Sequence, residues 1–393
     1  RVTYSGLISL ILGVFNILIG LGFTIIITRS LSEIEFGTWG LIGGLVIYAT
    51  IIEPIVTFWT TREIARNQES ANTAIFTGLF LSGIGLVIYL ISGIILFYQT
   101  EIEQDVIYLG LMLVPLFLIN KILSSITLGW KPQGVSYGQL VLTSSQLCVG
   151  FLLMIIFDFG LIGVIITVAI STIASIGFFI IYNKSKLKTS IQKKFIKKWI
   201  KFSWVSLYPN LGPTIIAFDV MVFSIITGSI FGIAFWTASL TIVSILSAPQ
   251  LISRATYSKL LQGGDKTFVQ ENMRLLIYFI ILFTGIVITF AKHGLFILNP
   301  IYSEIGLIVI IMAMWVAIRV ISSNLLTFVT GVDQVDVDEH QNARNYFKSS
   351  LIHVPSVYLV QSIVYIVTLS IVLLFATFSN HTNFELILYW AII

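Results

Sequence analysis

The chain has 393 residues, of which 57% are hydrophobic, 13% aromatic and only 10% charged. Soluble domains have about 25% charged residues, so this composition excludes a soluble enzyme and a disordered chain. The net charge of +4 is too small for a nucleic-acid-binding protein, and the single Cys148 cannot form an intrachain disulfide. We therefore predict an all-α polytopic membrane protein that is not an enzyme and has no cofactor, metal or nucleic-acid partner.

Twelve apolar stretches are long enough to be transmembrane helices, since a helix needs about 20 apolar residues to cross about 30 Å of hydrocarbon. In chain order, the predicted spans are 4–29, 38–60, 73–98, 106–128, 139–157, 160–182, 202–226, 231–254, 273–291, 305–330, 354–378 and 383–393. The first stretch has no small-residue cleavage site after a short apolar core, so we expect a span and not a signal peptide. We expect the twelfth to be truncated.

The basic residues predict the orientation, because Lys and Arg concentrate on the cytoplasmic side of membrane proteins. With a cytoplasmic N-terminus, all but four of the 22 Lys and Arg residues fall in cytoplasmic segments. The four exceptions are Arg29 and Lys292 in external loops and Lys121 and Arg319 within spans. An error of one span would destroy this segregation, so we predict twelve helices with the N-terminus in the cytoplasm.

A basic segment at 183–201 divides the chain into two six-helix bundles, 1–182 and 202–393. Phe36-Gly37 and Phe231-Gly232 are 195 residues apart, and the same offset relates Pro54 to Pro249. Because each half has an even number of spans, the halves are predicted to be parallel repeats. Such repeats typically rock against each other around a central cavity that binds the substrate.

Four segments carry a family resemblance. The stretch 27–39 contains Arg29, Glu35 and Gly37, and the second span ends in a segment that begins at Arg62. With 218–232 and 257–265, these motifs make residues 1–290 resemble the polysaccharide-biosynthesis (O-antigen flippase-like) branch of the multidrug/oligosaccharidyl-lipid/polysaccharide exporter superfamily. Ser32, where the family often has Pro, departs from the pattern.

The resemblance implies a flippase that moves a polyprenyl-linked oligosaccharide from the cytoplasmic to the external leaflet by alternating access. Its role would be in cell-surface polysaccharide or glycoprotein glycan assembly, in the cell membrane of a prokaryote. The implied partners are the lipid-linked oligosaccharide, membrane lipids and, as candidates, glycan-assembly enzymes, with a monomer as the default state.

Polar residues deep in the spans are the candidate functional residues, since inserting an ionisable side chain there costs about 2.5–3.5 kcal/mol. We predict a substrate pathway lined by Arg319, Lys121, Asn16 and Ser323. Asp219 and Glu53 are predicted to couple an ion or to pair with a cation, and Arg29 to pair with Glu33 or Glu35. A purely structural role stays open for each of these residues.

Three further sets of residues have plainer interpretations. The acidic loop 333–340 fits no Ca²⁺ or Zn²⁺ spacing, so a solvated loop is expected. The lysines of 184–201 follow the positive-inside rule and can hold anionic lipid headgroups. The tryptophans near span ends are predicted interface anchors, namely Trp130, Trp199, Trp204 and Trp390.

Two other functions are kept open. A cation-coupled multidrug exporter of the same fold would need an acid-centred apolar cavity, whereas the deep charges here are mixed. A membrane glycosyltransferase is suggested only by Glu33-Ile34-Glu35, in a loop of about eight residues that provides no domain for an acceptor.

Overall fold

The structure is a computed structural model that describes residues 2–99, 104–250, 267–332, 349–379 and 381–393. The first half, which we call the N-lobe, consists of α1 (Val2–Ser30), α2 (Glu33–Ala49), α3 (Pro54–Ala65), α4 (Ala71–Gln99), α5 (Gln104–Gly110), α6 (Leu113–Trp130), α7 (Gln133–Gly150) and α8 (Gly160–Tyr182). A π-helical turn at Phe151–Ile156 extends α7.

The linker helix α9 (Lys193–Lys201) leads into the second half, which we call the C-lobe. Its helices are α10 (Ser203–Ala217), α11 (Asp219–Thr227), α12 (Ile230–Val243), α14 (Thr267–Leu298), α15 (Gly306–Val332), α17 (Ser350–Phe378) and α18 (Asn383–Ile392). The short 3-10 turns η3 (Ser244–Ser247) and η4 (Pro300–Ile305) follow α12 and precede α15.

The predicted spans agree with the helices. Among the described residues, ten helical segments are long and apolar enough to cross a membrane. The pair α2 and α3, bent by 65°, forms an eleventh span if it crosses as one unit, and the shorter apolar helix α18 lies at the predicted twelfth. The all-α polytopic fold is therefore confirmed.

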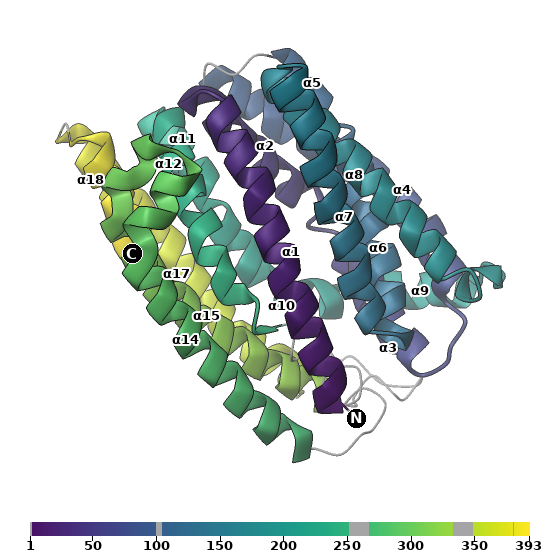
Figure 1. The fold of residues 1–393 in the computed structure, drawn as a ribbon. Coiled ribbons are helices and arrows are strands. Elements are labelled where there is room, and N and C mark those ends of the chain that lie inside the picture. The colour runs from purple at the N-terminus through teal and green to yellow at the C-terminus, as the bar shows by residue number, and fades with distance from the viewer. Residues whose placement is uncertain (1, 100–103, 251–266, 333–348, 380) are drawn as a thin grey trace.

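The same helix pairs pack in both lobes. In the N-lobe α1 packs against α7 and α4 against α6, and in the C-lobe α10 packs against α17 and α14 against α15. The two groups lie on opposite sides of the molecule, with α1 crossing the view between them (Figure 1). Helix α2 ends at Ala49 and α12 at Val243, so the breaks coincide within one residue at the offset of 195.

Proline explains where the second span changes direction. Pro54 opens α3 directly after the break, and a proline has no N–H to continue the preceding helix. In the seventh span Pro209 and Pro213 lie inside α10, which ends before α11 begins at Asp219. The seventh span remains one candidate span, Ser203–Thr227, in which only Phe218 separates α10 from α11.

The structure corrects the interpretation of two tryptophans as interface anchors. Trp199 is 0% exposed and Trp390 is 1% exposed. Trp199 packs on α3 because α9 is amphipathic and buries Phe195 with it, one helical turn apart. Trp390 stacks on Trp236 with centroids 3.8 Å apart, inside the C-lobe.

Candidate functional site

The two broken spans touch at their breaks. The hydroxyl of Tyr48, at the end of α2, donates a hydrogen bond to the carbonyl oxygen of Ala217 over 2.8 Å. The Tyr48 ring stacks on Phe218 with centroids 4.6 Å apart. Ala217 and Phe218 form the junction between α10 and α11. This contact joins the N-lobe to the C-lobe at about the middle of the predicted membrane.

An ion pair lies beside the break in the N-lobe. The ammonium of Lys121, on α6, is 2.9 Å from a carboxylate oxygen of Glu53, in the turn before Pro54. Thr57 donates a hydrogen bond of 2.6 Å to the other oxygen of Glu53. The Lys121 side chain is 46% exposed and that of Glu53 18%. The structure therefore brings these two predicted residues together, with the lysine still accessible.

A buried carboxylate lies beside the break in the C-lobe. Asp219 is 8% exposed and accepts hydrogen bonds from the Tyr365 hydroxyl at 3.1 Å and the Trp390 indole N–H at 3.2 Å. Its other oxygen caps the Val220 N–H at 2.7 Å. Asp219 also interacts electrostatically with Arg319. This carboxylate thus connects α11 to α15, α17 and α18.

Arg319 is exposed near the centre of its span. It lies 13 residues from both ends of α15, or about 20 Å at 1.5 Å per residue. Its guanidinium lies over the Trp315 ring, 5.1 Å from the centroid. One turn further along α15, the hydroxyl of Ser323 accepts a hydrogen bond of 3.3 Å from Gln250. Ser323 therefore connects α15 to the segment that follows η3.

Lys121 and Arg319 occupy nearly equivalent positions in the two lobes. Adding the offset of 195 to Lys121 gives position 316 on α15, one helical turn before Arg319. Each is exposed, and each interacts with an acid next to a helix break. The fold thus provides one intramembrane cation from each lobe, on the helices that the repeat relates.

A cleft of about 400 Å³ separates α1 from α12 at mid-membrane depth. It is apolar with a few hydroxyl and amide groups, and residues from both lobes line it: Ile17, Gly20, Leu21, Phe23, Thr24, Gln146, Thr237, Leu240, Thr241 and Ser244. A ligand can therefore fit between the two lobes at this cleft.

Asn16 lies next to this cleft but serves the packing of α1 on α7. Its amide nitrogen donates to the Ser136 carbonyl at 3.4 Å, and its oxygen accepts from the Thr143 hydroxyl at 3.1 Å. With 7% exposure, Asn16 is a helix-packing residue in this structure, which is the structural role left open for it.

Hydrogen bonds close the boundary at its external end. Arg29 donates from its guanidinium to the carbonyl oxygens of Ile297 and Leu298, at 3.0–3.3 Å. Asn299 donates to the Thr28 carbonyl at 2.9 Å. The expected pairing of Arg29 with Glu33 or Glu35 is replaced by this bond to the end of α14, because the C-terminal carbonyls of a helix attract a cation.

The other motif residues at this end shape the approach of the lobes. Glu35 forms a capping box with Ser32 at the start of α2, so the serine that departs from the family pattern has a clear role. Gly37 allows α2 to approach α12, since a Cβ there would clash with the Ile230 carbonyl oxygen.

Arg62 and Glu63 lie together at the cytoplasmic end of α3. Both are buried, with exposures of 0% and 2%. The Arg62 guanidinium lies 4.7 Å from the Phe58 ring centroid. Glu63 accepts from Lys198 at 3.3 Å and from the Trp199 indole at 3.2 Å. This motif therefore seats α9 on the N-lobe.

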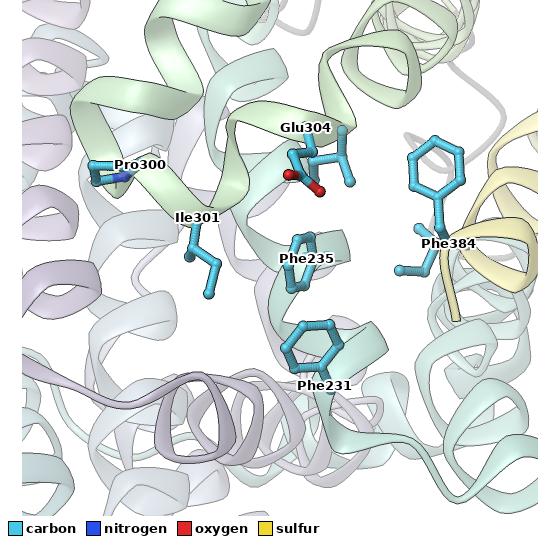
Figure 2. A pocket seen from close by; sticks show the side chains of 8 residues that line it. Phe231, Phe235, Pro300, Ile301, Glu304 and Phe384 are labelled. Carbon is cyan, nitrogen blue, oxygen red and sulfur yellow. The ribbon is translucent and has the colours of Figure 1, made fainter. Parts of the chain in front are cut away.

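A second cavity, of about 230 Å³, opens at the external end of the C-lobe. Figure 2 shows the Glu304 carboxylate above the rings of Phe235 and Phe231, with Phe384 to their right. It is built by α12, η4 and α18, and Lys121 and Arg319 do not line it.

Some predicted residues lie outside the described part of the chain. These are the acidic loop 333–340 and the motif segment 257–265. Within the described residues, no group of three His, Cys, Asp or Glu side chains is placed to hold a metal ion.

Sequence reasoning missed the partners that fix these charges. Trp390 is predicted only to be an interface anchor, and Tyr48 and Tyr365 are not among the predicted site residues, although a tyrosine in mid-span needs a hydrogen-bond partner. Glu63 directly follows Arg62 in the motif segment but is not among the predicted site residues. The sequence signal that could have identified Glu63 is an acidic residue directly after Arg62, in a chain with a run of lysines at 184–201.

Comparison with protein-family models gives no match, and comparison with curated protein sequences gives none either. The structure does resemble solved structures of MATE proteins. One, a MATE protein in complex with MaL6, has a TM-score of 0.65 and 12% identity, covering 100% of this chain and 92% of that one.

Two others represent different states of a multidrug resistance MATE family transporter of the MOP superfamily. The inward-facing conformation has a TM-score of 0.57 and 12% identity, covering 92% of this chain and 98% of that one. The outward-facing conformation has a TM-score of 0.57 and 14% identity, covering 95% and 96%. The chain therefore has the fold of these MATE structures.

Proposed function

We propose that this protein is an alternating-access transporter that flips a polyprenyl-linked oligosaccharide to the external leaflet of a prokaryotic cell membrane. The observation that carries the proposal is the pair of exposed intramembrane cations, Lys121 in the N-lobe and Arg319 in the C-lobe. A diphosphate that links sugar to lipid carries negative charge, and cations on both lobes match that charge.

The arrangement of the lobes suits uptake from the cytoplasmic side. Arg29 and Asn299 hold the lobes together at the external end, while the cleft between α1 and α12 lies deeper in the membrane. Neither Lys121 nor Arg319 lines this cleft, so under this proposal the headgroup extends beyond the cleft to reach the two cations while its polyprenyl tail stays in lipid. Release to the outside requires the hydrogen bonds of Arg29 and Asn299 to break. It also requires the two lobes to close together at their cytoplasmic ends.

The membrane potential favours this direction for an anionic cargo. Moving one net negative charge from a negative interior to the outside releases about 2.3 kcal/mol per 100 mV. This direction does not require an ion gradient, and neither Asp219 nor Glu53 has to carry a coupling ion for transport to proceed.

A cation-coupled multidrug exporter is the second candidate, and one observation favours it. Asp219 is a buried carboxylate with two side-chain hydrogen-bond donors and no ion pair among the described residues. Such a group can take up a proton or cation. Under this alternative, Asp219→Asn abolishes the dependence of transport on an ion gradient.

Transport by purified protein in liposomes separates the two functions. A fluorescent polyprenyl diphosphate N-acetylglucosamine is the probe, and its loss of signal to external dithionite reports flipping. Ethidium uptake driven by a proton or sodium gradient is measured in parallel. We expect flipping by the wild type, no ethidium uptake, and a loss of flipping of at least tenfold in the Lys121→Gln, Arg319→Gln double variant.

Lys292→Gln is the matched control, because Lys292 is an exposed cation at the external end of α14. It removes one positive charge without touching the intramembrane pair, and flipping is expected to stay at the wild-type rate. Gradient-driven ethidium uptake without flipping would support the multidrug exporter instead.

A further inference from the structure

The linker helix α9 lies where the cytoplasmic surface of the membrane is expected. It begins 11 residues after α8 ends at Tyr182, and it ends two residues before α10 begins at Ser203. Both flanking helices are membrane spans, so α9 is held close to the bilayer at both ends. It lies beside α3 and α4 of the N-lobe, and Figure 1 shows it at the same end of the molecule as the end of α3.

One face of α9 is fixed to the protein. Phe195 is 5% exposed and Trp199 is 0% exposed, and both pack into the cluster around Trp59 of α3. Lys198 reaches Glu63 at 3.3 Å, and Trp199 donates to the same carboxylate oxygen at 3.2 Å. These contacts tie α9 to α3, which is the inner half of the span that bends by 65°.

The opposite face combines positive charge with exposed apolar side chains. Lys193, Lys194, Lys197 and Lys201 are all exposed, and none of them forms an ion pair with a described residue. Ile200 is 64% exposed between them. The segment 183–201 contains eight lysines and no acidic residue, so no acid within this segment offsets their charge.

We propose that α9 binds the anionic phospholipid headgroups of the cytoplasmic leaflet. Through the bonds of Lys198 and Trp199 to Glu63, this binding also restrains α3. A basic amphipathic helix at the interface places its lysines at the headgroups and its apolar side chains at the acyl boundary. Ile200 has that position beside the lysines. An acidic protein partner satisfies the charges but leaves the isoleucine without an apolar environment, so we favour the lipid.

The consequence is a lipid-dependent restraint on the inner half of the bent span. With anionic lipid present, α9 is held at the leaflet by its lysines and at α3 by Lys198 and Trp199. The restraint is then greatest in anionic membranes and absent in neutral ones. It does not depend on which substrate is transported.

A spin label tests the lipid contact. The label is placed at Ile200→Cys in a Cys148→Ser background, since Cys148 is exposed, and the protein is reconstituted in nanodiscs of phosphatidylglycerol or phosphatidylcholine. Accessibility to oxygen and to a nickel chelate reports whether the label lies in lipid or water. We expect a shift toward oxygen accessibility in phosphatidylglycerol only.

Two variants form the matched pair: in one all four exposed lysines are replaced by Gln, and in the other all four are replaced by Arg. The lysines are Lys193, Lys194, Lys197 and Lys201. Each lysine at an anionic leaflet contributes about a fivefold preference, so the Gln variant is expected to lose the shift and the Arg variant to keep it. Equal behaviour of the two variants, or equal accessibility of the wild-type label in both lipids, overturns the proposal. The proposal is also overturned if adding polyglutamate to phosphatidylcholine nanodiscs shifts the accessibility of the label more than phosphatidylglycerol does. That result indicates an acidic protein partner.

The coupling through Glu63 has its own readout. The Tm of the wild type is expected to rise by several degrees from phosphatidylcholine to phosphatidylglycerol nanodiscs. Glu63→Gln is expected to lose most of that lipid-dependent rise, whatever its Tm in phosphatidylcholine. An unchanged rise in this variant overturns the coupling. Neither measurement involves transport, so both stand apart from the proposed function.

Discussion

The hydroxyl of Tyr48 lies 2.8 Å from the carbonyl oxygen of Ala217 and joins the two broken spans at their breaks. Tyr48 precedes the turn that leads to Pro54, and Ala217 ends the helix that contains Pro209 and Pro213. Helix breaks are where a span can change direction with little loss of backbone hydrogen bonding. A bond between two such breaks links the movement of one lobe to that of the other.

Tyr48→Phe is expected to shift the balance between inward-open and outward-open states. The variant keeps the stacking on Phe218 and removes one hydrogen bond, which contributes about 0.5–1.5 kcal/mol. Populations of the two states should change by about two- to tenfold. Electron-spin distances between labels on the cytoplasmic ends of the two lobes measure this change.

Tyr89→Phe provides the control for that prediction. Tyr89 is fully buried in the N-lobe, and its hydroxyl has no hydrogen-bond partner among the described residues. Removing a buried unpaired hydroxyl is expected to leave the populations unchanged and the stability equal or higher. A similar shift in both variants would contradict a specific role for the Tyr48 bond.

Gly37→Ala is expected to destabilise the protein by about 1–3 kcal/mol, because the new methyl overpacks the contact between α2 and α12. A Cβ at Gly37 would clash with the Ile230 carbonyl oxygen and would lie 2.7 Å from the Ile230 side chain. Thermal unfolding measures the effect. Gly43→Ala on the same helix meets nothing within 4 Å, so that variant should keep or raise the Tm. If both substitutions leave the Tm unchanged, the two helices are not in close contact there.

Arg29→Gln is expected to loosen the external closure. Arg29 makes charge-assisted bonds to the Ile297 and Leu298 carbonyls, and bonds to charged groups contribute about 1.5–3 kcal/mol. A cysteine at Thr237, which lines the cleft, should then react at least tenfold faster with an external maleimide in a Cys148→Ser background. Lys292→Gln is the control and should leave the reaction rate unchanged.

The sequence was sufficient for the fold because the fold depends on long-range patterns. Apolar runs of about 20 residues predict spans, and the offset of 195 locates equivalent breaks after Ala49 and Val243. The side-chain partners depend on tertiary contacts that no periodicity encodes. Asp219 meets Tyr365 and Trp390 across 146 and 171 residues.

The candidate site residues within the spans can be found by counting ionisable residues. Four ionisable residues within spans are conspicuous in an apolar chain, and the structure pairs Lys121 with Glu53. The offset of 195 relates Lys121 to position 316, one helical turn before Arg319, so the correspondence of these two cations can be found from the sequence. Arg29 was harder, since its partners are backbone carbonyls of a helix 268 residues away, which have no side-chain signature.

The central claim is that Lys121 and Arg319 bind one anionic headgroup between the lobes. Glu53 already holds Lys121 at 2.9 Å, so this carboxylate competes with the cargo for the lysine. Removing the acid should therefore strengthen binding, while removing the lysine should weaken it. A role in stability alone predicts loss for both.

The most direct measurement is the Kd for a soluble citronellyl diphosphate N-acetylglucosamine, obtained by calorimetry on the wild type, Glu53→Gln and Lys121→Gln. The account predicts that Glu53→Gln lowers the Kd by several-fold and that Lys121→Gln raises it by at least tenfold. Equal Kd values in all three proteins, or weaker binding in Glu53→Gln, would contradict it.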